Sequence, residues 1–207
     1  MPSYTIRTTS PAGSNLPYYN TTGSGGMNTS IQGNTAVSGA DVLNNCVGYS
    51  QGRMLEMYAE LNGLTPPFTN LFSMFNVDAE NWLTVAINNG FMTGSAPQEG
   101  AVGVYYASGQ NLGHVCNIEQ WDAVNQRWDI TEGHYYYPTP PGNGSWDYSY
   151  LQSNNIPAFI GNDPDWQLLG FIYPFGYTPT PGAPGGNSIV AARSRKNKLK
   201  RSMTILL

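Results

Sequence analysis

Charged side chains are scarce in this chain of 207 residues, since Asp, Glu, Lys and Arg together make up only 11%. Basic residues are nearly missing before the C-terminal tail, where only Arg7, Arg53 and Arg127 occur. No basic stripe with interleaved aromatics is present there, which excludes nucleic acid as a substrate. Gly, Ser, Thr, Asn, Tyr and Pro are abundant instead, and this composition favours a loop-rich fold that contains β-strands.

Cysteine is also rare, and the two that occur, Cys46 and Cys116, exclude a disulfide framework. No apolar run approaches the roughly 18 residues that indicate a membrane-spanning helix. The N-terminal residues show no charged segment followed by an apolar one, so we expect no signal peptide. We therefore expect a protein that is made in a cytoplasm and has no membrane span.

The remaining basic residues are concentrated at the end of the chain. They are Arg193, Arg195, Lys196, Lys198, Lys200 and Arg201. All 13 acidic residues precede this run, and a like-charge tail of this kind typically docks on an acidic partner. Composition divides the chain into a Gly/Ser/Thr-rich arm over residues 1–36, a domain over 37–177, and a Pro/Gly linker with the basic tail over 178–207.

Two helices are expected in the first half of the domain. The first begins at Asn44-Asn45, which are good N-cap residues, and ends at Asn62-Gly63. Its apolar residues recur at helical spacing: Met54, Met57, Tyr58 and Leu61. The second helix is expected from Asp78 to Asn89, where Gly90 ends it.

Strand composition follows the two helices. The expected strands cover residues 101–106, 114–121, 127–137 and 170–173, with a long loop over 138–155. Helices followed by strands, with a hairpin among them, indicate an α+β domain in which helices pack on an antiparallel sheet.

Cys46 lies in the first turn of the first expected helix. A helix N-terminus stabilises the negative charge of a thiolate, which is the nucleophilic form of cysteine. The unpaired backbone N–H groups of that turn can also hold an oxyanion, and we name those of Asn45 and Cys46 for this role. A small buried packing cysteine is the alternative interpretation.

Only two histidines, His114 and His134, are available as a base for such a nucleophile. Side chains alternate along a strand, and a five-residue turn centred on Ala123 would place His114 opposite Glu132. Glu132 would then orient the imidazole, the part that an acidic third residue plays in nucleophilic triads. A register shifted by two residues would set His134 opposite His114 instead, and His134 is therefore the rival third residue.

Metal binding is the competing chemistry, but the chain contains no CxxC, HxxxH or HExxH spacing. We therefore predict no metal and no cofactor. Cys116 is expected to be a packing residue of the hairpin.

Four segments in order resemble a known family. The stretch NNCVGYSQGRMLE resembles the nucleophile helix of CHAP domains, the cysteine/histidine-dependent amidohydrolases and peptidases of phage lysins and bacterial autolysins. GHVCNIE and ITEGHYYY resemble the two strands that follow in the family, and FIYPFG resembles its closing strand. The resemblance covers roughly residues 25–177.

The resemblance implies a papain-like fold of the NlpC/P60-CHAP type. It implies Cys46 as nucleophile, His114 as base and Glu132 as the acidic third residue. Where many members of the family have Asn two residues after that Glu, this chain has His134. Some members bind calcium, but no Asp-rich ligand loop is present here.

The function expected from these features is hydrolysis of an amide bond in peptidoglycan, by a virion protein at a phage tail tip during genome entry. Other tail proteins would be its partners, through the N-terminal arm and the basic tail. A free endolysin and a catalytically inactive tail plug are the alternatives. Aromatic residues expected to line the substrate groove are Tyr49, Trp121, Tyr135 and Trp146.

Overall fold

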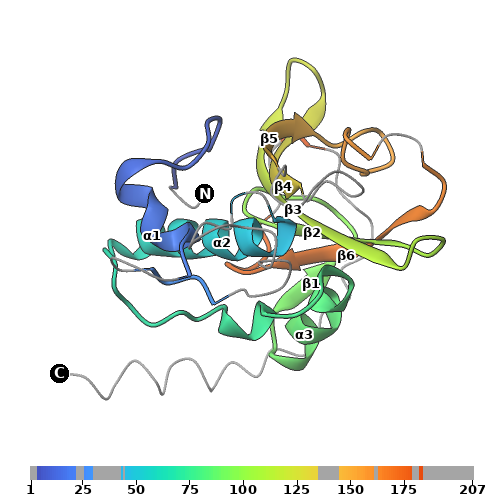
Figure 1. Cartoon of the computed structure of the whole chain (residues 1–207). Coiled ribbons are helices and arrows are strands. Elements are labelled where there is room, and N and C mark those ends of the chain that lie inside the picture. Colours follow the sequence, from blue (N-terminus) through green and yellow to red (C-terminus); the bar gives the residue numbers. More distant parts are fainter. Residues whose placement is uncertain are drawn as a thin grey trace.

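The computed structural model describes residues 4–21, 26–29, 43, 45–134, 145–160, 163–178 and 182–183. These residues form an α+β fold in which α-helices and 3-10 helices accompany one β-sheet (Figure 1). The helical elements are η1 (Gly13–Asn15), α1 (Leu16–Tyr19), α2 (Cys46–Asn62), η3 (Ser73–Phe75), η4 (Ala79–Asn81) and α3 (Trp82–Asn88). The strands are β1 (Met92–Gly94), β2 (Val102–Ala107), β3 (Leu112–Asp122), β4 (Arg127–His134), β5 (Ser145–Tyr150) and β6 (Trp166–Tyr173).

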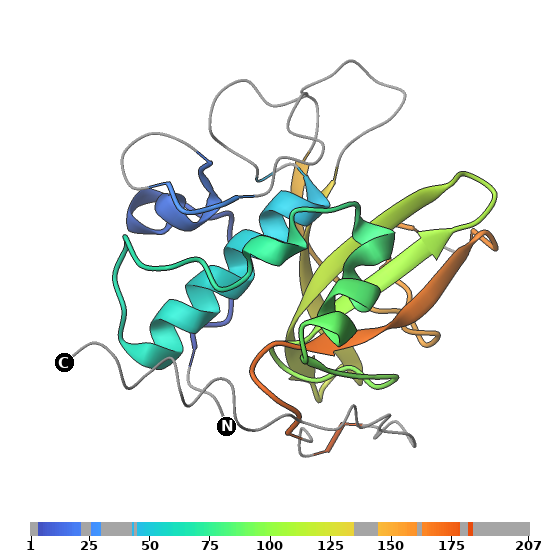
Figure 2. The same ribbon diagram turned by 90° about the horizontal axis from the view of Figure 1, so that it is seen from below.

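The sheet has six strands in the order β1-β6-β2-β3-β4-β5, and every neighbouring pair is antiparallel. Helix α2 contacts β3 and β4, whereas α3 contacts β1 and β6. Figure 2 shows α2 with its first turn toward the strands and its last turn away from them. No helix in the described ranges has the length and apolar character needed to cross a membrane. The predicted arrangement of helices on an antiparallel sheet is confirmed.

Both faces of the sheet are covered by apolar side chains. On the helical face, Val104 and Val115 pack with residues of α2 and α3 such as Met54 and Trp82. On the opposite face, Ile118 and other strand residues pack under the segment that follows β5. Burial of about 25 cal/mol per Å² of apolar surface makes these two layers the main stabilising contribution.

Helix α2 begins and ends where the sequence predicts. The side chain of Asn45 accepts a hydrogen bond from Gly48 N at 2.8 Å, so Asn45 is the N-cap. Gly63 adopts a left-handed conformation with φ of 63°, which a C-terminal glycine adopts without strain. The second helix region is split, because η4 forms the first turn and α3 continues it to Asn88.

Part of the segment expected to be an extended arm or loops is helical and packed. Helix α1 lies against α2, and Tyr18 and Tyr19 are buried in the helical core. Gly52 makes this contact possible, because a Cβ atom there would lie 2.4 Å from the Tyr19 ring. The described N-terminal residues therefore belong to the packed fold.

Two strands were not predicted. Strand β1 is only three residues long, and β5 occupies residues that were expected to be loop. Trp146, Tyr148 and Tyr150 alternate along β5, which is the strand period. Proline and glycine on the N-terminal side of this stretch masked that signal.

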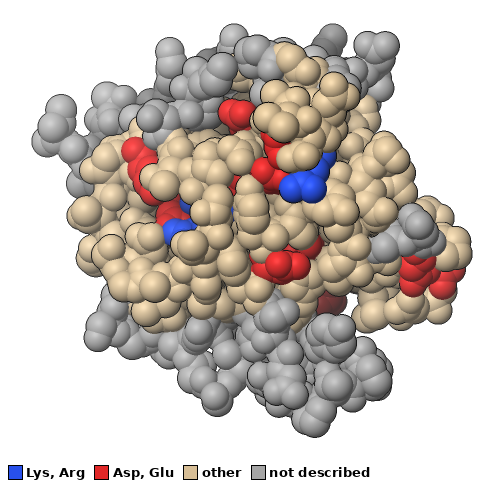
Figure 3. Space-filling model, turned by 90° about the horizontal axis from the view of Figure 1, so that it is seen from above, with Lys and Arg blue, Asp and Glu red and all other residues tan. Residues whose placement is uncertain are grey.

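The face of the molecule seen in Figure 3 carries few charges, whereas Arg53 makes its ion pairs in the interior. Arg53 of α2 donates to both oxygens of Glu119 on β3 at 2.8 and 2.7 Å, and to Glu56 at 2.7 Å. Arg7 also pairs with Glu56, and Thr131 of β4 donates to Glu119 at 2.7 Å. Because Arg53 and Glu119 are both fully buried, neither can be left without its partner at low cost.

Arg53→Met should lower the free energy of unfolding by about 3–5 kcal/mol, because it leaves the buried Glu119 carboxylate unpaired. The matched control is Arg127→Met, which removes a guanidinium that is 38% exposed and should cost less than about 1 kcal/mol. Urea unfolding measures both values. Equal losses in the two variants would contradict the role given to the buried pair.

Candidate active site

The site begins at the first residue of α2. Cys46 is half-buried, and Asn45 before it caps the helix through its side chain. The N–H group of Gly48 donates to the side chain of Asn45 and that of Tyr49 donates to the Asn45 carbonyl, both at 2.8 Å. The N–H groups of Cys46 and Val47 have no acceptor within the helix, so that of Cys46 is placed to stabilise negative charge next to its own sulfur.

Strands β3 and β4 separate where the helix begins. Their pairing runs from Asp122↔Arg127 to Asn117↔Thr131 and does not continue along the described residues beyond it. Gly133 of β4 instead faces the start of α2, and a Cβ atom there would lie 2.5 Å from Leu43 O and 2.8 Å from Asn45 O. A glycine at this position therefore lets the helix approach the sheet closely enough to bring Cys46 to the histidine.

His114 on β3 is held between Cys46 and Glu132. Its Nε2 lies 2.7 Å from Oε2 of Glu132, a fully buried carboxylate. The other oxygen of Glu132 accepts a hydrogen bond from Ser149 Oγ at 2.8 Å, which fixes the carboxylate from β5. The Cys46 side chain also raises the pKa of the ring, and since Nε2 faces Glu132, Nδ1 is the ring atom that remains to face the sulfur. The three residues named for catalysis are thus brought together.

The predicted hairpin register was wrong, although the contact between His114 and Glu132 that was inferred from it is made. Ile118 pairs with Ile130 and not with Trp128, because the turn is shorter than expected and a bulge follows at Glu119. This two-residue shift is the rival register, in which the rings of His114 and His134 stack with centroids 6.0 Å apart. Glu132 reaches His114 from the diagonal position, which long side chains can span.

The electrostatics of the site favour a charged imidazole on His114. Burial by itself lowers the pKa of His114, but hydrogen bonds to Cys46 and Glu132 and the negative charges on both raise it to about 9. The imidazolium is therefore the form of His114 present at neutral pH. A cysteine beside an imidazolium combines a nucleophilic side chain with a proton donor for a leaving group.

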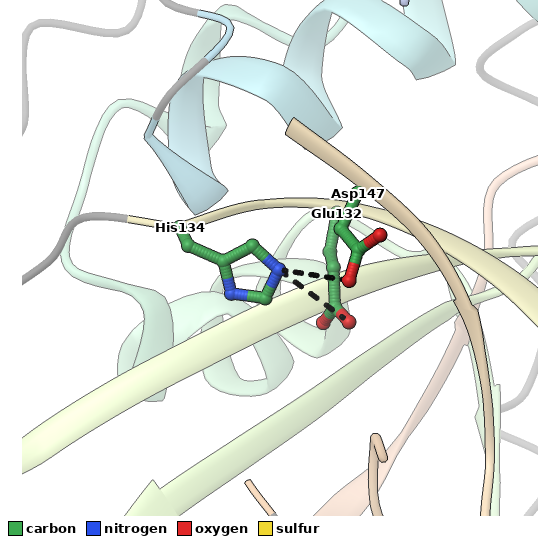
Figure 4. Close-up of side chains that lie close together, drawn as sticks. All are labelled: Glu132, His134 and Asp147. Atoms are coloured by element: carbon green, nitrogen blue, oxygen red, sulfur yellow. Dashed lines mark ion pairs between the residues drawn. The ribbon is translucent and has the colours of Figure 1, made fainter. Parts of the chain in front are cut away.

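His134 does not take the position of the third residue, for which it was the alternative to Glu132. Its Nε2 lies 3.8 Å from Glu132 Oε1 and 3.9 Å from Asp147 Oδ2, beyond hydrogen-bond distance of both (Figure 4). Burial lowers the pKa of His134, and the neighbouring His114 acts in the same direction. The hydrogen-bond partner of the His114 imidazole is therefore Glu132 and not His134.

A cleft of about 430 Å³ opens onto Cys46, His114 and His134. The other residues that line it are Asn45, Val47, Asp78, Ala79, Glu80, Asn111, Leu112, Gly113, Phe159 and Trp166. Lys and Arg do not occur among these lining residues, whereas Asp78 and Glu80 give the cleft a negative charge. A glycine at position 113 accommodates Glu80, whose Oε2 would lie 2.3 Å from a Cβ atom there.

The aromatic residues predicted for the groove are not those that line the cleft. Tyr49 is fully buried and stacks on Tyr19 with centroids 5.4 Å apart, so it belongs to the core. Trp146 packs edge-on to Tyr49 at 6.4 Å, and Trp121 lines a separate pocket near the β3–β4 turn.

Tyr135 lies outside the described residues. Phe159 and Trp166 take the expected place, with ring centroids 4.8 and 6.3 Å from that of His114. Phe159 follows β5 in a segment without periodic pattern, so no local signal marks it. Trp166 begins β6, four residues before the predicted start of that strand. Cys116 is fully buried in the second core layer, as predicted for a packing residue.

Comparisons with protein-family models, with curated protein sequences and with solved structures give no match to this chain. The chemistry of the site therefore rests on its own geometry.

His114 should titrate near pH 9 in metal-free buffer, and Glu132→Gln should lower that pKa because the charge beside the ring is removed. Histidine-ring NMR measures the midpoint, with His134→Gln assigning the two signals. Because the folded pKa lies above the ordinary value of 6.5, the stabilisation is fully present below pH 6.5 and is lost as the pH rises through about 9. An unchanged midpoint in Glu132→Gln would show that this carboxylate does not set the pKa.

Proposed function

We propose that this protein is a cysteine-dependent amidase or endopeptidase of the CHAP type, with a papain-like arrangement, that cleaves an amide bond in the peptides of peptidoglycan. The observation that carries the proposal is the buried contact of 2.7 Å between His114 and Glu132, with Cys46, at a helix N-terminus, lining the same cleft as that ring. Nucleophile, base and orienting carboxylate in this order match the geometric requirements of nucleophilic amide hydrolysis.

The order of the segments supports the same class. The Cys46 helix precedes the strand that carries His114, and the strand with Glu132 follows, as the resemblance to CHAP domains implies. The negative cleft adds a preference for the substrate. Asp78 and Glu80 favour a peptide with a free amino group, which the peptides of peptidoglycan carry.

In the proposed reaction the Cys46 thiolate attacks the carbonyl carbon, and the backbone N–H of Cys46 stabilises the oxyanion. The His114 imidazolium gives its proton to the leaving amine as the C–N bond breaks, which leaves a thioester. Neutral His114 then takes a proton from water, and the hydroxide displaces the sulfur to release the carboxylic acid. Thiolate and imidazolium are restored, and Glu132 holds the ring throughout.

The charge along the chain supports the proposed site of action. We place the protein in a phage virion, at the tail tip, because the basic tail of residues 193–201 suits docking on an acidic partner. Helix α1 packs on α2, and Thr5 and Arg7 bond to Glu60 and Glu56 of that helix, so we assign docking to the basic tail.

Cys46→Ala should abolish release of fragments from purified peptidoglycan, with a loss of at least about 10³-fold, because no other group can form the thioester. Cys116→Ala is the matched control, since it removes the chain's other thiol from the core and should keep most of the activity. Mass analysis of the products names the bond that is cut. Equal activity of wild type and Cys46→Ala would remove Cys46 as the nucleophile, and an inactive wild type would favour a structural tail plug.

Purified virions should contain the protein, and deletion of residues 193–207 should reduce its amount there without changing hydrolysis by the free protein. Mass spectrometry of virions from the two strains measures this. Absence from virions, with activity in the lysate, would favour a free endolysin.

A further inference from the structure

Three side chains converge beside His114 without bonding one another directly. Glu132 and His134 lie two residues apart on β4. Asp147 lies on the neighbouring strand β5, where it pairs directly with Glu132. One ligand atom from each lies within 4.8 Å of the other two (Figure 4). The group combines one imidazole and two carboxylates on neighbouring strands of a rigid sheet.

The spacing fits a small ion better than it fits hydrogen bonds. The separations of 3.8 and 3.9 Å from His134 Nε2 exceed the roughly 2.7–3.2 Å of an N–H···O bond. Bonds of about 2.0–2.2 Å to one zinc ion place tetrahedral ligand atoms about 3.4 Å apart. A common ion therefore needs the two distances from His134 Nε2 to shorten by about 0.4–0.5 Å, and the two carboxylates, whose ligand atoms lie within 4.8 Å of each other, to approach as well.

The surroundings of the cluster supply what an ion needs. His134 is only 7% exposed and makes no hydrogen bond through its ring to the residues that the structure describes. The side chain of Asp147 is 49% exposed, so an ion can enter from solvent, and water can complete the coordination. No described Lys or Arg forms an ion pair with Glu132 or Asp147. Glu132 bonds the His114 ring through Oε2, so its Oε1 and the Asp147 carboxylate remain to face a cation.

We propose that Glu132, His134 and Asp147 form a binding site for a divalent transition-metal ion such as Zn²⁺, and that the bound ion inhibits the hydrolase. Imidazole with carboxylates suits Zn²⁺ and its spectroscopic substitute Co²⁺, whereas Ca²⁺ takes oxygen ligands alone. Inhibition rests on the proposed function. Glu132 would share its charge with the ion and hold the His114 imidazolium less well.

Sequence spacing did not predict this site, because Asp147 follows His134 on a separate strand. Only the pairing of β4 with β5 brings the third ligand to the other two.

Binding is tested with chelator-treated Cys46→Ala protein, in which the nucleophilic thiol cannot supply a ligand. We expect titration with CoCl2 or ZnCl2 to give one ion per chain by calorimetry, with a cobalt absorption spectrum free of thiolate bands. Asp147→Asn in the same background should weaken binding at least tenfold. Asp163→Asn is the matched control and should bind as tightly as the parent.

Folding of each variant is checked by its thermal unfolding midpoint, which added Zn²⁺ should raise in the parent and much less in Asp147→Asn. Equal affinity in Asp147→Asn and Asp163→Asn, or no binding at all, would overturn the site. None of these measurements requires catalysis, so they stand apart from a failure of the proposed function.

The inhibitory effect is measured separately, on wild type with its thiol intact. Zn²⁺ should reduce peptidoglycan hydrolysis, and Asp147→Asn should require at least tenfold more Zn²⁺ for the same fractional inhibition. Equal sensitivity of the two proteins would mean that Zn²⁺ acts at Cys46 and would overturn the inhibitory part.

Discussion

The buried bond between Arg53 and Glu119 determines how the helix meets the sheet. Arg53 lies two turns after Cys46 on α2, and Glu119 lies on the strand that carries His114. A bidentate pair in a fully buried position tolerates little displacement, because any shift leaves a charge without its partner. The pair therefore sets the height and rotation of α2, and with them the position of Cys46 over His114.

The separation of β3 and β4 is the second requirement of the site. Where pairing stops after Asn117↔Thr131, each strand keeps its outer neighbour: His114 stays paired with β2 and His134 with β5. The start of α2 meets the sheet at Gly133, and Cys46 and His114 line the same cleft there. Close packing and an interrupted ladder together make the contact.

Local signals in the sequence were sufficient for the helix and for the existence of the hairpin. Asn45 and Gly63 delimit α2 through caps that depend only on neighbouring residues. The register was not predictable in the same way, because Asp122 binds the N–H groups of Val124 and Asn125 and tightens the turn, and a bulge then shifts the pairing. Both are small local energies that alternation alone does not reveal.

The site residues also divide into those that local sequence signals identify and those that depend on contacts between distant segments. Cys46, His114 and Glu132 were identified from the sequence and lie together, whereas Tyr49 was assigned to the groove and is core. Phe159 and Trp166 reach the cleft through the folding of distant segments, which no local pattern encodes. The same holds for Arg53 with Glu119, since nothing near either residue indicates that they meet.

The wide spacing in sequence of the proposed catalytic residues has a consequence for biosynthesis. Glu132 is added to the growing chain 86 residues after Cys46. At about 5–20 residues per second, a ribosome needs roughly 4–17 s to cover that distance. Until then the nascent chain carries its thiol without the Glu132 carboxylate, and for the first 68 of these residues it lacks His114 as well. The three side chains of the candidate site can therefore meet only after the hairpin has been made.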